Sequence, residues 1–131
     1  MRKVFLLLMM LSLISTGLAA CGGESGSGGG SAQAGEKLFE QAAIGNQAGC
    51  STCHSLEPDV ILVGPSLAGV ADRAGERVAD LPAEDYLRQS IIDPDAYTVE
   101  GFSASVMPLV WSSVLEEEQI NDLVAFLLTL K

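Results

Sequence analysis

The sequence predicts a small all-α domain over residues 35–131. Apolar residues recur at helical spacing in several stretches, and the apolar–polar alternation that is typical of strands is scarce. The clearest stretch is the C-terminal one, where a broad apolar stripe follows three consecutive acids. No internal repeat divides the chain, and a stretch of this length suffices for one modest hydrophobic core.

Several helical segments are expected before the C-terminal one. The first covers 35–43 and presents one apolar face. A single turn at 50–54 follows a Gly-Asn-Gln loop, and another short turn is expected at 67–70, after a Gly-Pro break. A longer helix is predicted over 82–92, with a proline in its first turn and an Asp-Pro pair at its end. A loop then covers 95–112.

The final helix has two candidate starts. Ser113 with Glu116 fits a capping box, and Glu116 with Gln119 is the rival. The run of acids at 116–118 suits the positive end of the helix dipole, and we interpret it as a solvated first turn. An apolar stripe then continues the helix, formed by Ile120, Leu123, Val124, Leu127 and Leu128.

The run Cys50-Ser51-Thr52-Cys53-His54 is the attachment signature of a c-type haem. On one helical turn, positions i and i+3 share a face, so both thiols can reach the two vinyl groups of a porphyrin. The adjacent imidazole can turn toward the iron and supply the proximal ligand. The motif therefore predicts one covalently bound haem c.

Two other uses of a C-x-x-C pair stay open: a thiol–disulfide oxidoreductase and a zinc site. A thiol–disulfide oxidoreductase usually has a strand before the motif, whereas residues 45–49 look like a loop. The second needs four ligands, but His54 is the only histidine of the chain and Cys21 is the only other cysteine. A closed zinc site would therefore have to recruit an acidic residue.

The N-terminus has the pattern of a bacterial lipoprotein signal over residues 1–20. A basic start precedes an apolar segment that is too short for a confident membrane span, and small residues lead up to Cys21. We expect Cys21 to be diacylated and to become the mature N-terminus. The alternative is ordinary secretory cleavage that leaves a free thiol. Either route predicts an extracytoplasmic bacterial protein, and the first predicts one lipid-anchored to a membrane.

The Gly/Ser-rich residues 21–34 follow as the lipidated cysteine and a flexible linker, which would span roughly 20 Å as a tether. Loss of Arg2 and Lys3 with the signal takes the net charge from −10 to −12. So acidic a protein would repel nucleic acid. A docking partner is expected to present a basic or neutral face.

Met107 is the only methionine outside the signal peptide, and no second histidine exists. It lies in the predicted loop and directly precedes Pro108. A thioether suits low-spin haem iron and raises its reduction potential. The alternative is a methionine that fills a gap in the core. Ligation by both His54 and Met107 would leave no open iron position, which predicts electron transfer and no enzymatic activity or small-molecule substrate.

The domain resembles the class I cytochromes c, particularly bacterial monohaem domains, over essentially all of residues 35–131. The resemblance rests on the haem-attachment run, Gly64-Pro65-Ser66-Leu67, Tyr97 to Met107-Pro108, and the final helix. Residues 86–102 also look like the haem domains of respiratory oxidase and nitric oxide reductase subunits.

The resemblance implies a cytochrome c-like helical fold in which Gly35 and Phe39 cross Leu123 and Phe126. It also implies that the Pro65 carbonyl orients His54 by accepting a hydrogen bond. From the residues alone, Arg73 could contact a haem propionate or be a plain solvated charge. Tyr97 and Trp111 could donate to propionates, although packing at the core or rim is the expected role of both.

The function expected from these features is that of a membrane-anchored carrier of single electrons. Its partners would be redox proteins in or at the membrane, in respiratory or photosynthetic complexes. An alternative within this class is a fixed haem subunit of a larger oxidoreductase. A haem enzyme or gas sensor would need an open iron position, and a thiol or metal-binding lipoprotein would be colourless.

Overall fold

The computed structural model describes residues 29–131, so the predicted signal peptide, Cys21 and most of the linker lie outside the described residues. The described part is mostly helical, as predicted. Its α-helices are α1 (Ala32–Phe39), α2 (Cys50–Cys53), α3 (Val70–Ala74), α4 (Ala83–Ile92), α5 (Trp111–Val114) and α6 (Glu117–Leu127), and Pro94–Ala96 forms a 3-10 turn, η1. Two short strands, β1 (Ala43–Ile44) and β2 (Gln47–Ala48), pair antiparallel around a turn at Gly45.

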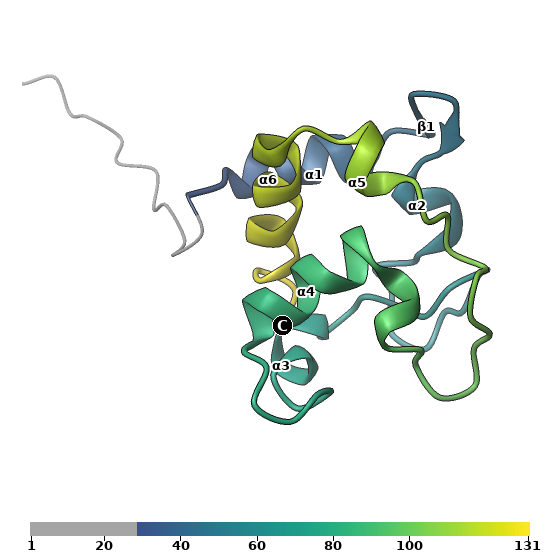
Figure 1. Ribbon diagram of the computed structural model, residues 1–131, viewed down its shortest axis with the longest axis vertical. Coiled ribbons are helices and arrows are strands. Elements are labelled where there is room, and N and C mark those ends of the chain that lie inside the picture. Colours follow the sequence, from purple (N-terminus) through teal and green to yellow (C-terminus); the bar gives the residue numbers. More distant parts are fainter. Residues whose placement is uncertain (1–28) are drawn as a thin grey trace, which may run out of the picture.

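Helices α1 and α6 cross and form the most extensive helix pair (Figure 1). Gly35 lies at the crossing, where a β-carbon would run into the Asp122 carbonyl and the Phe126 side chain. The ring centroids of Phe39 and Phe126 lie 5.5 Å apart. This is the crossing that the resemblance implied, and phenylalanine at position 126 fills it without a hydroxyl group.

The first helix begins earlier than expected and ends earlier, at 32–39 instead of 35–43. Ser31 caps it, since the Ser31 hydroxyl accepts a hydrogen bond from the Ala34 N–H. The Ser31 N–H in turn donates to the Asp122 carboxylate at 2.6 Å. The end of the Gly/Ser-rich stretch is thereby fastened to α6.

Four further expectations needed adjustment. Residues 45–49, expected as a loop, contain strand β2 just before the haem-attachment run. The short turn predicted at 67–70 is a helix at 70–74, and the predicted loop at 95–112 contains η1 at its start and runs into α5. The final helix uses the rival start: Glu116 is its N-cap, and the Glu116 N–H donates to Gln119 Oε1 at 3.0 Å. Helix α4 begins right after Pro82 and ends at Ile92, as predicted.

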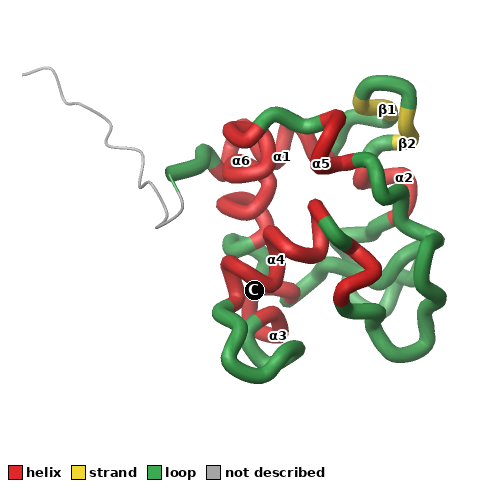
Figure 2. The backbone as a smooth tube through the Cα atoms, in the orientation of Figure 1, coloured by secondary structure: helices red, strands yellow, loops and turns green. Residues whose placement is uncertain are grey.

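The core lies between α6, α1, α4 and α5. Its buried side chains are almost entirely aliphatic or aromatic: Leu38, Phe39, Ile44, Val70, Ala74, Tyr86, Leu87, Ile91, Trp111, Leu115, Ile120, Leu123, Val124, Phe126 and Leu127. Arg88 of α4 pairs with Glu117 of α6 at 2.7 Å and also donates to Asn121. Long loops, 54–69 and 97–110, form the side of the molecule away from α6 (Figure 2).

Candidate functional site

The haem-attachment run begins on the single turn α2. Its backbone closes with a hydrogen bond from the His54 N–H to the Cys50 carbonyl at 2.9 Å, and Thr52 Oγ1 donates to the Gly49 carbonyl at 2.6 Å. Gly49 precedes the turn at a place where any β-carbon would collide with the Gln41 carbonyl. Only glycine therefore lets the β1–β2 hairpin lead this closely into the turn.

His54 is oriented by the loop that follows it. Its Nδ1 lies 2.9 Å from the Pro65 carbonyl oxygen. Because a carbonyl can only accept, Nδ1 carries the proton and Nε2 keeps a free lone pair. Burial lowers the pKa of His54, against the smaller opposite effect of the Pro65 carbonyl, so the ring is neutral at physiological pH. This arrangement makes Nε2 a ready metal ligand, with Pro65 as the partner that the resemblance implied.

Gly64 makes room for the imidazole. A β-carbon there would lie 2.5 Å from Cε1, 2.9 Å from Nδ1 and 3.1 Å from Nε2 of His54. The Gly64 N–H also donates to the Cys53 carbonyl at 2.9 Å, which fixes the loop against the turn. The orientation of the ring thus depends on both residues of the Gly64-Pro65 pair.

A cavity of about 460 Å³ opens beside the turn. Cys50, Cys53 and His54 line it, and Met107 lines it too, although Met107 lies 53 positions after His54 in the sequence. Most of the other walls are apolar side chains from α4, α5, α6 and the loops, including Tyr86, Leu87, Ile91, Trp111, Leu115, Leu123 and Leu127. A volume in this range suits a bound organic group.

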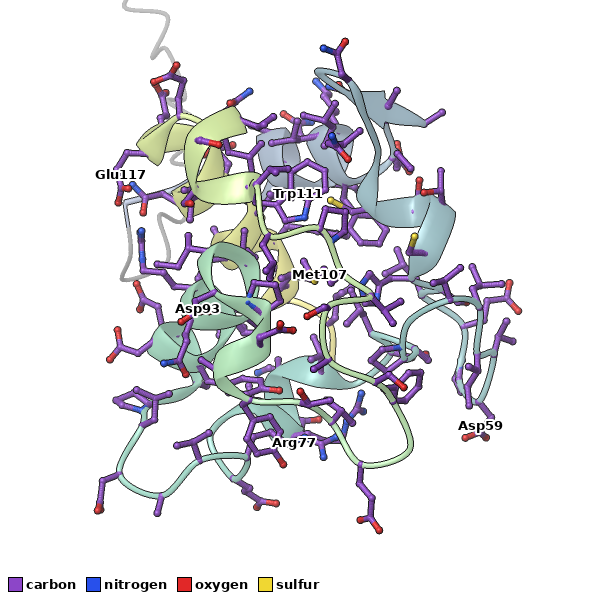
Figure 3. The ribbon with its side chains drawn as sticks, turned by 45° about the vertical axis from the view of Figure 1, so that its right-hand side comes forward. Asp59, Arg77, Asp93, Met107, Trp111 and Glu117 are labelled. Atoms are coloured by element: carbon purple, nitrogen blue, oxygen red, sulfur yellow. The ribbon has the colours of Figure 1, made fainter. Side chains whose placement is uncertain are left out.

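Met107 and Trp111 lie toward the middle of the molecule (Figure 3). Met107 is half-buried and packs against the core. Its loop is held by Asp95, whose carboxylate accepts hydrogen bonds from the Ser105 N–H at 2.6 Å and the Ser105 hydroxyl at 2.7 Å. The structure therefore brings the predicted axial pair, His54 and Met107, to one cavity.

Trp111 tests whether the cavity fits a haem. Its Nε1 is buried and is the one such side-chain atom without a hydrogen-bond partner among residues 29–131. Trp111 lines the cavity, and an unpaired buried donor is costly unless something else accepts its hydrogen bond. A haem bears two carboxylates, and a wall of apolar side chains suits its porphyrin. The residues present fit this group.

Of the other predicted pocket residues, two line the cavity and one does not. Pro65 and Tyr97 line the cavity, and the Tyr97 ring packs edge-on against Tyr86 at 5.7 Å between centroids. Arg73 does not line it: its guanidinium donates to the Ala68 carbonyl at 2.6 Å and the Ser66 carbonyl at 3.2 Å. Arg73 thus fastens the loop after Pro65, and its contact with a propionate stays a prediction.

The two alternatives to haem attachment find little support. Reactive cysteines have lowered pKa values, whereas burial raises the pKa of Cys50. Within residues 29–131, no cluster of three or more histidine, cysteine or acidic side chains could hold a metal ion, so a zinc site has no further ligands there.

Sequence reasoning missed the contact of Gly64 with His54 and the pairing of Asp95 with Ser105. The resemblance assigned a role to the Pro65 carbonyl, but Gly64 signalled only a chain break. No local signal links Asp95 to Ser105, because most of the nine residues between them form an irregular loop.

The cytochrome c family model matches residues 32–131. No curated protein matches the chain. Over the range that the structure describes, no helix is long and apolar enough to cross a bilayer. The match spans the whole folded domain, including the Cys50–His54 run and Met107. The chain therefore belongs to the cytochrome c family and is a class I cytochrome c.

Proposed function

We propose that this class I cytochrome c is a membrane-anchored monohaem protein that carries single electrons between respiratory or photosynthetic membrane complexes. Its family establishes an electron-carrying protein with covalently attached haem c. The observation that carries the electron-transfer part of the proposal is the meeting of Cys50, Cys53, His54 and Met107 around one cavity.

In this proposal, Cys50 and Cys53 would hold haem c through two thioether bonds, and His54 Nε2 and Met107 Sδ would bind its iron. The bound cofactor supplies one-electron chemistry between ferric and ferrous iron. Pro65 holds the His54 ring through Nδ1, and the apolar walls exclude water. If His54 and Met107 both bind the iron, no position would be left for a reactant, which favours a carrier over an enzyme.

The anchoring part of the proposal rests on the sequence before residue 29. A lipid on Cys21 would tie the domain to the membrane, and the Gly/Ser-rich linker would keep it at a high effective concentration near integral partners. Labelled palmitate should be incorporated by the full-length protein in an expressing bacterium and not by Cys21→Ser. Release of the wild-type protein in soluble form after cell lysis would argue against the anchor.

The second candidate is a fixed haem subunit of a larger membrane oxidoreductase. It is favoured by the likeness of residues 86–102 to the haem domains of such subunits. A subunit should co-purify with one complex at one copy through mild detergent extraction, whereas a free carrier should separate from it.

A visible spectrum of the exported full-length protein tests the cofactor and its ligation together. We expect the reduced protein to show the sharp bands of low-spin c-type haem, and carbon monoxide to change them little. A ready shift with carbon monoxide would indicate an open iron position and a ligand-binding function. A colourless protein with titratable thiols at Cys50 and Cys53 would remove the proposal altogether.

A further inference from the structure

The β1–β2 hairpin lies directly before the haem-attachment turn. Gly45 and Asn46 form its two-residue turn, and Gly45 has a positive φ of 59°, which favours glycine. Ile44 is the one buried residue of the two strands. The Gly49 N–H donates to the Ala42 carbonyl at 2.9 Å and continues the pairing up to the start of α2. The hairpin is therefore anchored in the core and continuous with the segment that carries the cysteines.

The tip of this hairpin contacts helix α5, which lies beside it (Figure 1). A β-carbon on Gly45 would lie 3.3 Å from Val114 Cγ1. Apart from the chain neighbours of Gly45, no other described heavy atom would lie within 4 Å of it. Val114 is half-buried and packs against the core. The contact thus involves one side chain of α5 and joins positions that are 69 apart in the sequence.

Helix α5 is a single turn, so it depends on its surroundings to stay in place. Its four residues are far fewer than an isolated helix needs to be stable in water. The Val110 carbonyl accepts hydrogen bonds from the Ser113 and Val114 N–H groups at 2.9 and 3.1 Å. Trp111 and Leu115 are buried and fix the side of the turn that faces the cavity. Val114 provides the contact with the hairpin.

Met107 lies four positions before α5 begins. It makes no hydrogen bond with any described residue, so the segments on either side determine where it lies. On the N-terminal side, Ser105 is held by Asp95. On the C-terminal side, the ring of Pro108 fixes one backbone dihedral angle, and α5 then begins at Trp111. A displacement of α5 would therefore move Met107.

The other neighbour of α5 is less able to move. Leu115 ends α5, and Glu116 is already the N-cap of α6, so no loop separates the two helices. Helix α6 packs against both α1 and α4. A shift of α5 would therefore be taken up mainly by the irregular chain on its N-terminal side, which includes Met107.

We propose that the contact between Gly45 and Val114 positions Met107, so that the hairpin limits how often the thioether leaves the haem iron. This inference rests on the proposed function, in which Met107 binds that iron. It gives a part in the ligation to two residues that do not line the cavity. Because the hairpin leads directly into α2, the same segment would help to place the cysteines, His54 and, through α5, Met107.

The test compares two valine-to-alanine substitutions in the full-length holoprotein. Val114→Ala shortens the side chain that contacts Gly45. Val78→Ala is the matched control, because Val78 is also half-buried and packs against the core without lining the cavity. The rate of carbon monoxide binding to the ferrous protein and the free energy of unfolding are measured for both. Met107→Leu gives the rate that is reached when no thioether is present.

We expect Val114→Ala to bind carbon monoxide about fivefold faster than the wild type, as for two methyl groups lost from a half-buried site, but more slowly than Met107→Leu. Val78→Ala should lower the free energy of unfolding by a similar amount and keep the wild-type rate. Loss of stability alone would affect both valine variants alike, so the difference between them reports positioning.

Equal carbon monoxide binding rates in Val114→Ala and Val78→Ala, whether slow or fast, would overturn the inference. A different outcome would concern the proposed function. If the wild-type protein already binds carbon monoxide as fast as Met107→Leu, Met107 does not bind the iron and the proposed ligation fails.

Discussion

Asp95 accepts two hydrogen bonds from Ser105, one from the backbone N–H at 2.6 Å and one from the hydroxyl at 2.7 Å. Ser105 has a left-handed backbone with φ of 59°, a conformation that costs free energy for a residue with a side chain. The Asp95 carboxylate offsets this cost and fixes the chain two residues before Met107.

Replacing Asp95 with alanine should therefore loosen the Met107 loop. We expect Asp95→Ala to bind carbon monoxide faster in the ferrous state, because Met107 would leave the iron more often. Glu100→Ala, which removes an exposed acid from the same loop, is the control and should behave as the wild type. Equal carbon monoxide binding by all three proteins would show that the Asp95–Ser105 contact does not hold the loop.

The same contact predicts a pH dependence. Hydrogen bonds from the Ser105 backbone and side chain lower the pKa of Asp95. The contact is therefore fully formed above the ordinary pKa of an aspartate, about 3.9, and is lost as pH falls through the lowered value. Carbon monoxide binding to the ferrous protein should accelerate only in that acidic range. Asp95→Asn should lack this acceleration, and a midpoint near neutrality would point to another group.

How far the sequence predicts this molecule depends on whether a feature is local. The Cys50–His54 turn, helix α4 and the stripe of α6 follow from spacing within a few residues, and the structure has all three. The start of α1 was missed because a Gly/Ser-rich stretch reads as linker, yet Ser31 in it is an N-cap that Asp122 fixes from α6. That contact spans 91 residues and leaves no local pattern.

For the candidate site, too, local features could be predicted from the sequence and long-range contacts could not. Residue types alone singled out His54 and Met107, since each is unique in the domain, but spacing could not show that both line one cavity. Helix α5 begins inside the predicted loop 95–112, because its four residues, Trp111–Val114, are too few for a periodic pattern. Its formation buries Trp111 in the cavity wall, a consequence that only the fold reveals.

Gly64→Ala should disturb the proximal ligand. The added methyl group would press on the His54 ring, with Cε1 only 2.5 Å away, and would tilt it from the Pro65 carbonyl. We expect a loss of about 1–3 kcal/mol in the free energy of unfolding, as for other overpacked sites, and a changed reduction potential. Denaturant titration and redox titration measure the two effects.

Gly75→Ala is the matched control for that substitution. A β-carbon at Gly75 would meet its nearest neighbours at an ordinary 3.7 Å, and its φ of −72° is accessible to alanine. This variant should keep the wild-type potential. If Gly64→Ala leaves both the free energy of unfolding and the reduction potential unchanged, the loop must shift to accept the methyl group without moving the His54 ring.

Met107→Ala should open one side of the iron. The reduced protein should then bind carbon monoxide readily, and its potential should fall by a sizeable part of the roughly 0.8 V range that axial ligands control. The substitution also removes packing contacts. At a fully buried site this lowers the free energy of unfolding by about 2–5 kcal/mol, and the loss is smaller here because Met107 is half-buried. Met107→Leu separates the effects, since it restores apolar volume without sulfur. A leucine variant with the wild-type potential would exclude Met107 as a ligand.

Trp111→Phe tests whether the Nε1 of Trp111 donates a hydrogen bond to the bound cofactor, because the two cases predict different reduction potentials. If a cofactor carboxylate accepts the buried Nε1 hydrogen bond, phenylalanine should destabilise the holoprotein by about 1.5–3 kcal/mol beyond its smaller volume. It should also lower the reduction potential, because a carboxylate that loses its donor presents more negative charge to the iron. If Nε1 has no partner in the holoprotein, the substitution removes the cost of an unpaired buried donor. The reduction potential should then stay at the wild-type value. Redox titration decides between the two cases, because the loss of packing alone leaves the charge near the iron unchanged.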